Sequence, residues 1–459
     1  MNEPMTTRRL EALLREIPRR YRLPALPALP GSPSTSLAVI IETARRALEA
    51  GKPPDPALEP RFIEAMVALI HEAMQPNAGD PAFQAMVLRH HSAPVREYLE
   101  LSAQQHRDRR RIHNLVNAVA HPGKLRRVAA GAMRDTLERL QQAATHSHWA
   151  AMLAAAELLE TMPDIQSHPG PADMLTQLRE EPALQRLRRL EGLLEHPEIQ
   201  QYQHLLKLQG PAANSHAAAT EGAAARQRGM DVETLAKQAL QALADRLNRS
   251  DSLAGALPYR VVTAMYVPAA FPNRQEGAKT EWDAVLLRKA PEPAGGSAAA
   301  SWDVCLLVEA KASADAAGTD FIRLLRGLRL LAQAQADQVY LFKTREGVMP
   351  LRGASLQALP TEADPLHDWV LYCSTDSPDK EPRLLNAAAR MQLLSAPQCL
   401  EFAGALAASG HADTRILTPL WPELLSAPAW QAVLHQYPAQ RLARELMVHV
   451  DDLRQAGIS

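Results

Sequence analysis

The pattern of apolar and polar residues changes character about halfway along the chain. Between residues 37 and 208, apolar residues recur at steps of three and four, as in FIEAMVALIHEAM and HWAAMLAAAELLETM, which is the spacing of amphipathic helices. We expect these helices to begin or end at the prolines that interrupt the pattern, Pro76, Pro122, Pro163 and Pro182. The pattern predicts an all-α N-terminal domain over residues 1–208.

Residues 209–229 are small and polar, and we expect a linker there whose second half is compatible with a helix. The next segment, DVETLAKQALQALADRLN, carries one apolar helical stripe. It is followed by three segments that are rich in valine, leucine and aromatic residues and bounded by proline or glycine clusters, YRVVTAMYV, TEWDAVLL and WDVCLLVEAK. This composition is typical of strands.

An amphipathic helix, TDFIRLLRGLRLLAQAQA, and a short strand, DQVYLFKT, complete the order helix, three strands, helix, strand. The segment DWVLYCS is compatible with a further strand. The predicted fold class is therefore α/β, a mixed sheet flanked by helices, preceded by the all-α domain. The α/β domain is expected over residues 230–375, and a helical extension over residues 376–459.

Composition narrows the function classes. Lys and Arg number 50 against 51 Asp and Glu, so the overall charge does not indicate a polyanion binder. The three cysteines lie far apart without CxxC spacing, which argues against a disulfide framework or zinc ribbon and favours a reducing cytoplasm. The chain lacks a signal-peptide pattern and an apolar run of about 18 residues, so no membrane partner is expected. Neither a glycine-rich phosphate loop nor a GxSxG elbow occurs.

Candidate chemistry lies in the third predicted strand. Glu309 and Lys311 are two positions apart and therefore share one face of the strand. A carboxylate in an apolar strand needs a partner, and pairing of the second and third strands would bring Asp283 beside Glu309. Two carboxylates on adjacent strands are typical ligands of Mg²⁺, or of Mn²⁺, in phosphodiester hydrolysis. Lys311 would then orient the nucleophile or offset charge on the phosphoryl oxygens.

Over residues 229–349, this order of elements, with Asp283 on the second strand and Glu309-x-Lys311 on the third, resembles the PD-(D/E)XK nuclease superfamily. The resemblance implies a restriction-endonuclease-like fold and metal-dependent cleavage of DNA or, less often, RNA. It also implies metal ligation by Asp283, Glu309 and the backbone carbonyl of Ala310, with Lys311 as the motif lysine. Glu233 matches a glutamate that many members carry on the helix before the first strand.

Two features depart from the family pattern, since Trp282 replaces the proline before the motif aspartate and a loop rich in Gly, Ala and Ser lengthens the interval to Glu309. Other interpretations stay open. Glu309 and Lys311 would also suit a salt-bridged pair at a strand end, and Glu281 beside Asp283 would suit a solvated face. Glu233 would also suit the first turn of a helix with Lys237 as its i+4 partner.

Two further hypotheses concern the whole protein. The fold could serve as a catalytically inactive scaffold or binding module, in which the same residues would be close together but occluded or salt-bridged. The N-terminal helical domain would recognise a target or a protein partner, as in a toxin or defence component. Its most basic run, residues 106–127, would be a DNA-contacting face or a solvated helix.

Overall fold

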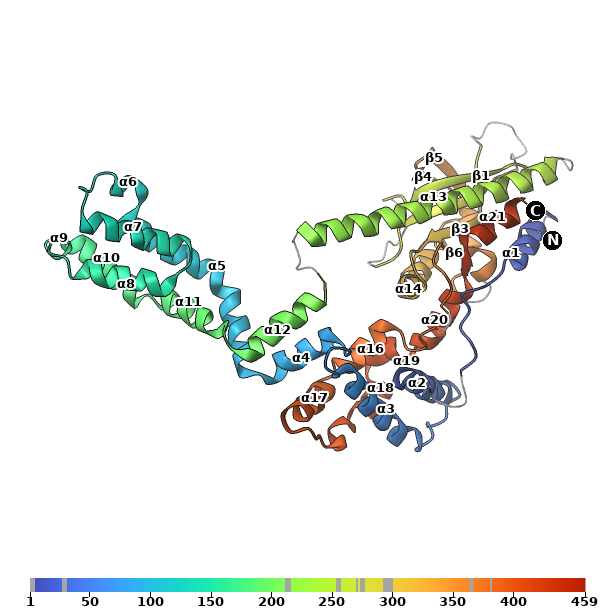
Figure 1. The fold of residues 1–459 in the computed structure, drawn as a ribbon. Helices are drawn as coiled ribbons and strands as arrows, with labels where there is room; N and C mark the ends of the chain where they lie inside the picture. The colour runs from blue at the N-terminus through green and yellow to red at the C-terminus, as the bar shows by residue number, and fades with distance from the viewer. Residues whose placement is uncertain are drawn as a thin grey trace. The chain divides into compact units, whose positions relative to one another are not determined.

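The computed structural model describes residues 5–26, 31–210, 216–252, 257–269, 271–272, 277–291, 300–362, 366–379 and 382–458. The chain divides into two compact units that are each assembled from separate stretches (Figure 1). Unit 1 comprises residues 1–69, 213–396 and 417–459, and unit 2 comprises residues 70–212 and 397–416. The architecture is mixed α/β, as the sequence predicts.

Unit 2 is helical, and prolines set its boundaries. Its helices are α4 (Pro81–His91), α5 (Ala93–Ala120), α6 (Pro122–Leu125), α7 (Ala132–Thr145), α8 (Trp149–Glu160), α9 (Pro163–Gln166), α10 (Pro169–Glu180), α11 (Pro182–Leu193), α12 (Pro197–Leu208) and α17 (Pro397–Ser409). Helices begin at Pro122, Pro163 and Pro182, and α3 (Leu58–Ala73) ends shortly before Pro76, so the predicted positions are confirmed. The fixed φ of proline suits the first helical position, where no N–H is needed.

The basic run in unit 2 is partly neutralised. Asp108 lies inside it, is buried, and accepts two hydrogen bonds of 2.7 Å from the guanidinium of Arg186. Arg111, three residues further on, forms an ion pair with Glu181 at 3.2 Å. At these two positions the basic run of α5 contacts other helices of unit 2. Asp108 binds Arg186 of α11, and Arg111 binds Glu181, the residue just before α11.

Unit 1 contains a seven-stranded sheet in the order β2-β1-β4-β5-β3-β6-β7, with an additional β2–β3 pairing. The strands are β1 (Tyr259–Tyr266), β2 (Glu281–Lys289), β3 (Trp302–Ala310), β4 (Val339–Thr344), β5 (Gly347–Arg352), β6 (Val370–Ser374) and β7 (Met447–His449). The predicted antiparallel meander β1–β2–β3 is present. Because β2 also pairs with β3, the strands β2, β1, β4, β5 and β3 close into a ring, although single residue pairs join β1 to β4 and β5 to β3.

Two strands pair with β3 in parallel, β5 at a single residue pair and β6 at four. The sequence marks the segment that forms β6 only as compatible with a strand. All of β6 is buried, as expected of a strand inside a parallel arrangement. The earlier segment DQVYLFKT forms β4, which instead makes a hairpin with β5 and exposes Val339 and Leu341. The two strands β4 and β6 therefore differ in burial, since β6 is buried on both faces and β4 is partly exposed.

Helices cover both faces of this sheet (Figure 1). One core packs Phe321, Leu324 and Leu328 of α14 (Ala314–Leu331) against the sheet. The opposite core contains α13 (His216–Ser252), α21 (Val450–Ile458) and α1 (Met5–Glu16). The remaining α-helices of unit 1 are α2 (Pro33–Glu49), most of α3, α15 (Gly353–Gln357), α16 (Ala387–Leu394), α18 (Leu420–Ser426), α19 (Gln431–Leu434) and α20 (Gln436–Glu445).

The boundaries of the units differ from the predicted domains. Leu10, Leu13 and Leu14 of α1 lie in the core beneath the sheet, so the N-terminal residues do not belong with the helices of unit 2. The predicted C-terminal extension likewise contributes β7 and α21 to unit 1. Residues 216–229 of the predicted linker are the first turns of α13, while residues 211–215 lie outside the described residues.

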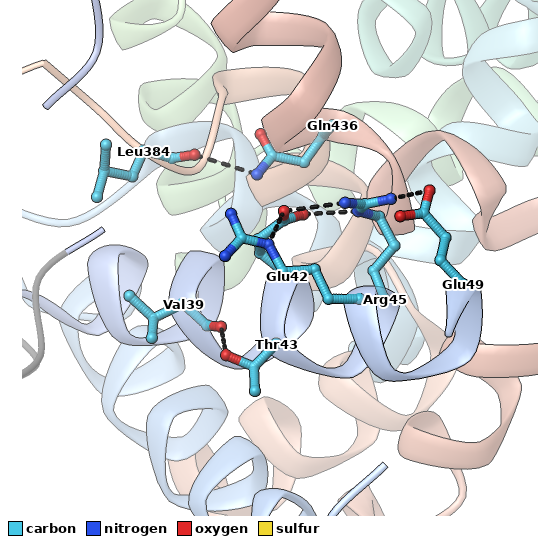
Figure 2. A network of polar contacts seen from close by, with 8 residues as sticks. Val39, Glu42, Thr43, Arg45, Glu49, Leu384 and Gln436 are labelled. Carbon is cyan, nitrogen blue, oxygen red and sulfur yellow. Dashed lines mark hydrogen bonds and ion pairs between the residues drawn. The ribbon is translucent and has the colours of Figure 1, made fainter. Parts of the chain in front are cut away.

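Unit 1 also holds an ionic cluster on α2, centred on the buried Glu42 and Arg45 and completed by the exposed Arg46 and Glu49. Glu42, which is 2% exposed, accepts hydrogen bonds from Arg45 Nε at 2.6 Å and Arg46 Nε at 2.7 Å, while Glu49 pairs with Arg45 (Figure 2). Burial raises the pKa of Glu42, but the two arginines outweigh this and hold it below its ordinary value. The cluster is satisfied internally, which argues for a structural role.

Candidate functional site

The β2–β3 hairpin brings Asp283 and Glu309 together as predicted. Pairing between the two strands ends at Ala284 with Val308, so Asp283 and Glu309 occupy the next position of the register, where the strands separate. At this point Asp283 Oδ2 accepts a hydrogen bond of 2.8 Å from the N–H of Ala310. The Asp283 carboxylate thus accepts a hydrogen bond from the β3 backbone at the point where the main-chain pairing of β2 and β3 ends.

The backbone of β1 is unusual opposite this point. Ala264 has a φ of +48°, in the left-handed region that alanine rarely adopts. Its neighbours Thr263 and Met265 pair with Ala284 and Trp282, which places Ala264 opposite Asp283. The alternation of faces shifts here, because Val262 and Met265 both contribute to the core on the α14 side. The irregularity lies beside the candidate site, which is where strand irregularities often occur.

Glu309 is fully buried, with 0% of its surface exposed. Its Oε2 contacts Lys279 Nζ at 2.5 Å and Lys311 Nζ at 3.3 Å. Its Oε1 is also buried and has no hydrogen-bond partner within the described residues. Burial, and secondly the charge of Asp283, raises the pKa of Glu309 to about 8, although both lysines oppose the shift.

Lys311 is shared between two carboxylates. Besides Glu309, its Nζ contacts Asp320 Oδ2 of α14 at 3.1 Å, and it lies 5.8 Å from the ring centroid of Tyr372. Burial lowers the pKa of Lys311, but Glu309 and Asp320 more than offset this and raise it above its ordinary value. Its side chain remains 15% exposed, so the ammonium is the less enclosed of the two that contact Glu309.

Glu233 lies on α13, within the electrostatic reach of the same cluster. Burial raises the pKa of Glu233, and the next largest contribution is the negative charge of Asp283. The alternative interpretation of Glu233 does not describe the structure. Because α13 begins at His216, Glu233 is far from the first turn, and Lys237 contacts Glu346 at 2.9 Å.

The sequence motif did not reveal Lys279 or Asp320. Lys279 precedes β2 in the segment GAKTEWD, and nothing in that segment marks one lysine as buried. Asp320 lies on α14, which begins only after Lys311, so it is the packing of α14 on the sheet that brings the two side chains together.

Comparison of the chain with protein-family models, with curated proteins and with solved structures finds no match. The resemblance to the PD-(D/E)XK superfamily therefore rests on the residues and elements themselves. In the described part of the chain, no helix combines the length and apolar character needed to cross a membrane.

The side chains at the end of the hairpin offer few ligands for a metal ion. Within the described ranges, no group of three or more His, Cys, Asp or Glu side chains is arranged to hold a metal ion. Mg²⁺ is usually held by only one or two carboxylates together with waters, which is the number that Asp283 and Glu309 provide. The buried, unpartnered Oε1 of Glu309 needs a cation or a proton. The residues present therefore fit a magnesium-type site.

Proposed function

We propose that unit 1 is a divalent-metal-dependent nuclease with a restriction-endonuclease-like fold, and that DNA is its main substrate and RNA the alternative. The observation that carries the proposal is the end of the β2–β3 hairpin, where Asp283, Glu309 and Lys311 meet. The meander, α14 and the parallel strand β6 support the proposed fold.

Asp283, Glu309 through Oε1, and the carbonyl of Ala310 would hold Mg²⁺ or Mn²⁺. When bound, the cation would polarise the phosphate and lower the pKa of a coordinated water. Lys311 would donate to a phosphoryl oxygen or to the attacking water, since its ammonium carries three donors and remains partly exposed. Glu233 would add negative charge on the α13 side of the site.

A second candidate function is a nuclease-like module that binds a partner without cleaving. The observation that favours it is the enclosure of Glu309, which is 0% exposed and already contacts two ammonium groups. A buried carboxylate paired in this way resembles a structural ion pair. The two functions differ in whether the protein needs a metal.

A cleavage assay tests the proposal. Purified protein would be incubated with labelled double-stranded and single-stranded DNA and RNA in Mg²⁺, Mn²⁺ or EDTA. We expect metal-dependent cleavage that falls by about 100-fold or more in Asp283→Asn, Glu309→Gln and Lys311→Met, because each removes a charge at the reacting centre. Lys343→Met, an exposed lysine of β4, is the matched control. Absence of cleavage together with absence of Mn²⁺ binding would favour the non-catalytic module.

A further inference from the structure

Lys279 is a second lysine at the candidate site, and its environment differs from that of Lys311. It precedes β2 and is only 3% exposed. Its N–H donates to the carbonyl of Arg323 on α14 at 3.3 Å. Its ammonium also lies 5.8 Å from the ring centroid of Trp282. Lys279 is therefore enclosed between the helix and the sheet, where it has no access to a substrate.

Gly327 is the residue of α14 that permits this enclosure. A Cβ at position 327 would lie 2.7 Å from Lys279 Cβ and 3.0 Å from its carbonyl oxygen. Real Cβ atoms essentially never show a contact as short as 2.7 Å, so any larger residue would displace Lys279 or the helix. Glycine is unfavourable inside a helix, and the close approach of the Lys279 backbone explains its presence at position 327.

Lys279 and Lys311 differ in which carboxylate each contacts and at what distance. Lys279 Nζ contacts Glu309 Oε2 at 2.5 Å, whereas Lys311 Nζ is 3.3 Å from that atom and 3.1 Å from Asp320. Lys279 is thus the tighter partner of Glu309. It contacts only one of the two oxygens, because Oε1 has no hydrogen-bond partner within the described residues.

We propose that Lys279 is a positioning residue, which holds Glu309 through Oε2 and leaves Oε1 as the oxygen available to the divalent cation. The inference rests on the proposed nuclease function. In this arrangement Lys279 makes the shorter contact with the buried carboxylate, so compensation of Glu309 does not depend on Lys311 alone. The longer contact between Lys311 and Glu309 can then give way to a contact with the substrate.

Mn²⁺ binding measured by isothermal titration calorimetry tests this role without relying on activity. We expect the wild-type protein to bind Mn²⁺ and Lys279→Met to bind it at least tenfold more weakly, with Lys343→Met unchanged. If Lys279 acts through Glu309, the double variant Lys279→Met/Glu309→Gln should bind no more weakly than Glu309→Gln alone. A general structural role would give additive losses instead.

Several results would overturn the assignment. Lys279→Met binding Mn²⁺ as tightly as the wild type would remove the positioning role, and tighter binding would show that Lys279 competes with the cation. No Mn²⁺ binding by the wild type would overturn the proposed nuclease function and this inference together. If Lys279→Met fails to fold by circular dichroism, recovery of folding in the double variant would support the pairing with Glu309. Failure of both variants to fold would overturn it.

Discussion

Glu309 combines two properties that rarely occur together in one side chain. It is fully buried, and one of its oxygens contacts two ammonium groups while the other has no hydrogen-bond partner within the described residues. Burying a charge without full compensation raises the free energy of the folded state. Charged groups in such environments are commonly found at functional sites. The sequence predicts the shared face of Glu309 and Lys311, but an enclosing lysine such as Lys279 depends on the packing of α14.

The raised pKa of Glu309 predicts a dependence of stability on pH. Between its ordinary value of 4.5 and about 8, the folded protein retains a proton on Glu309 that the unfolded chain has released. Folding is therefore linked to proton uptake, and the free energy of unfolding falls as pH rises through this window, by at most about 1.4 kcal/mol per unit. Removing the carboxylate should remove this part of the pH dependence.

Urea unfolding in EDTA at pH 5, 6.5 and 8 measures the effect, with Glu309→Gln compared to the wild type. We expect the wild type to lose more stability than the variant between pH 5 and pH 8. All other ionisable groups are common to both proteins, so the difference between the two profiles isolates Glu309. Parallel profiles would show that Glu309 has an ordinary pKa in the folded protein.

At the scale of elements, the sequence predicts those strands and helices that are determined by residues close together in the chain. The strands of the meander follow from their own apolar composition. The pairing of β3 with β6 joins residues about 60 positions apart, and no local pattern specifies it. Residues 209–229 are expected to form a linker whose second half is compatible with a helix. The many alanines of this segment favour that helix, and α13 begins at His216.

Ala264 offers a test at this scale. An alanine in the left-handed region costs about 1 kcal/mol relative to glycine. Ala264→Gly should therefore raise the free energy of unfolding by up to about 1 kcal/mol, if the strand keeps its path. Ala284→Gly is the matched control, because Ala284 is buried at an ordinary φ on the neighbouring strand and its replacement should destabilise. Thermal unfolding followed by circular dichroism compares them, and destabilisation by both would contradict the assigned backbone strain.

At the scale of the whole molecule, unit 1 is built from three stretches of the chain. The β7 strand pairs with β6, and Val448, Val450 and Leu453 lie in the core beneath the sheet. Changes of composition along the chain do not predict this arrangement. Composition describes neighbouring residues and does not indicate which distant segments pack together. The sheet that carries the candidate site thus depends for its core on residues close to both ends of the described chain.

This dependence predicts an effect of the helix α21 on the sheet. Leu453 is 0% exposed, and Leu453→Ala should lower the free energy of unfolding by about 2–5 kcal/mol because it leaves a cavity. The neighbouring Arg454, 56% exposed and paired with Asp451, provides the control Arg454→Ala, which should change stability by less than about 1 kcal/mol. Urea unfolding measures both variants, and equal effects would show that α21 does not support the core.

The order of assembly of unit 1 also has a consequence during translation. The ribosome releases Asp283, Glu309 and Lys311 well before it releases β7 and α21, which cover β6 and one face of the sheet. A nascent chain at that stage carries the candidate nuclease residues on a sheet whose apolar face is incompletely covered. The candidate site residues are therefore synthesised before the segments that complete the core of unit 1, and the proposed cleavage activity is expected only once α21 has been released and packed.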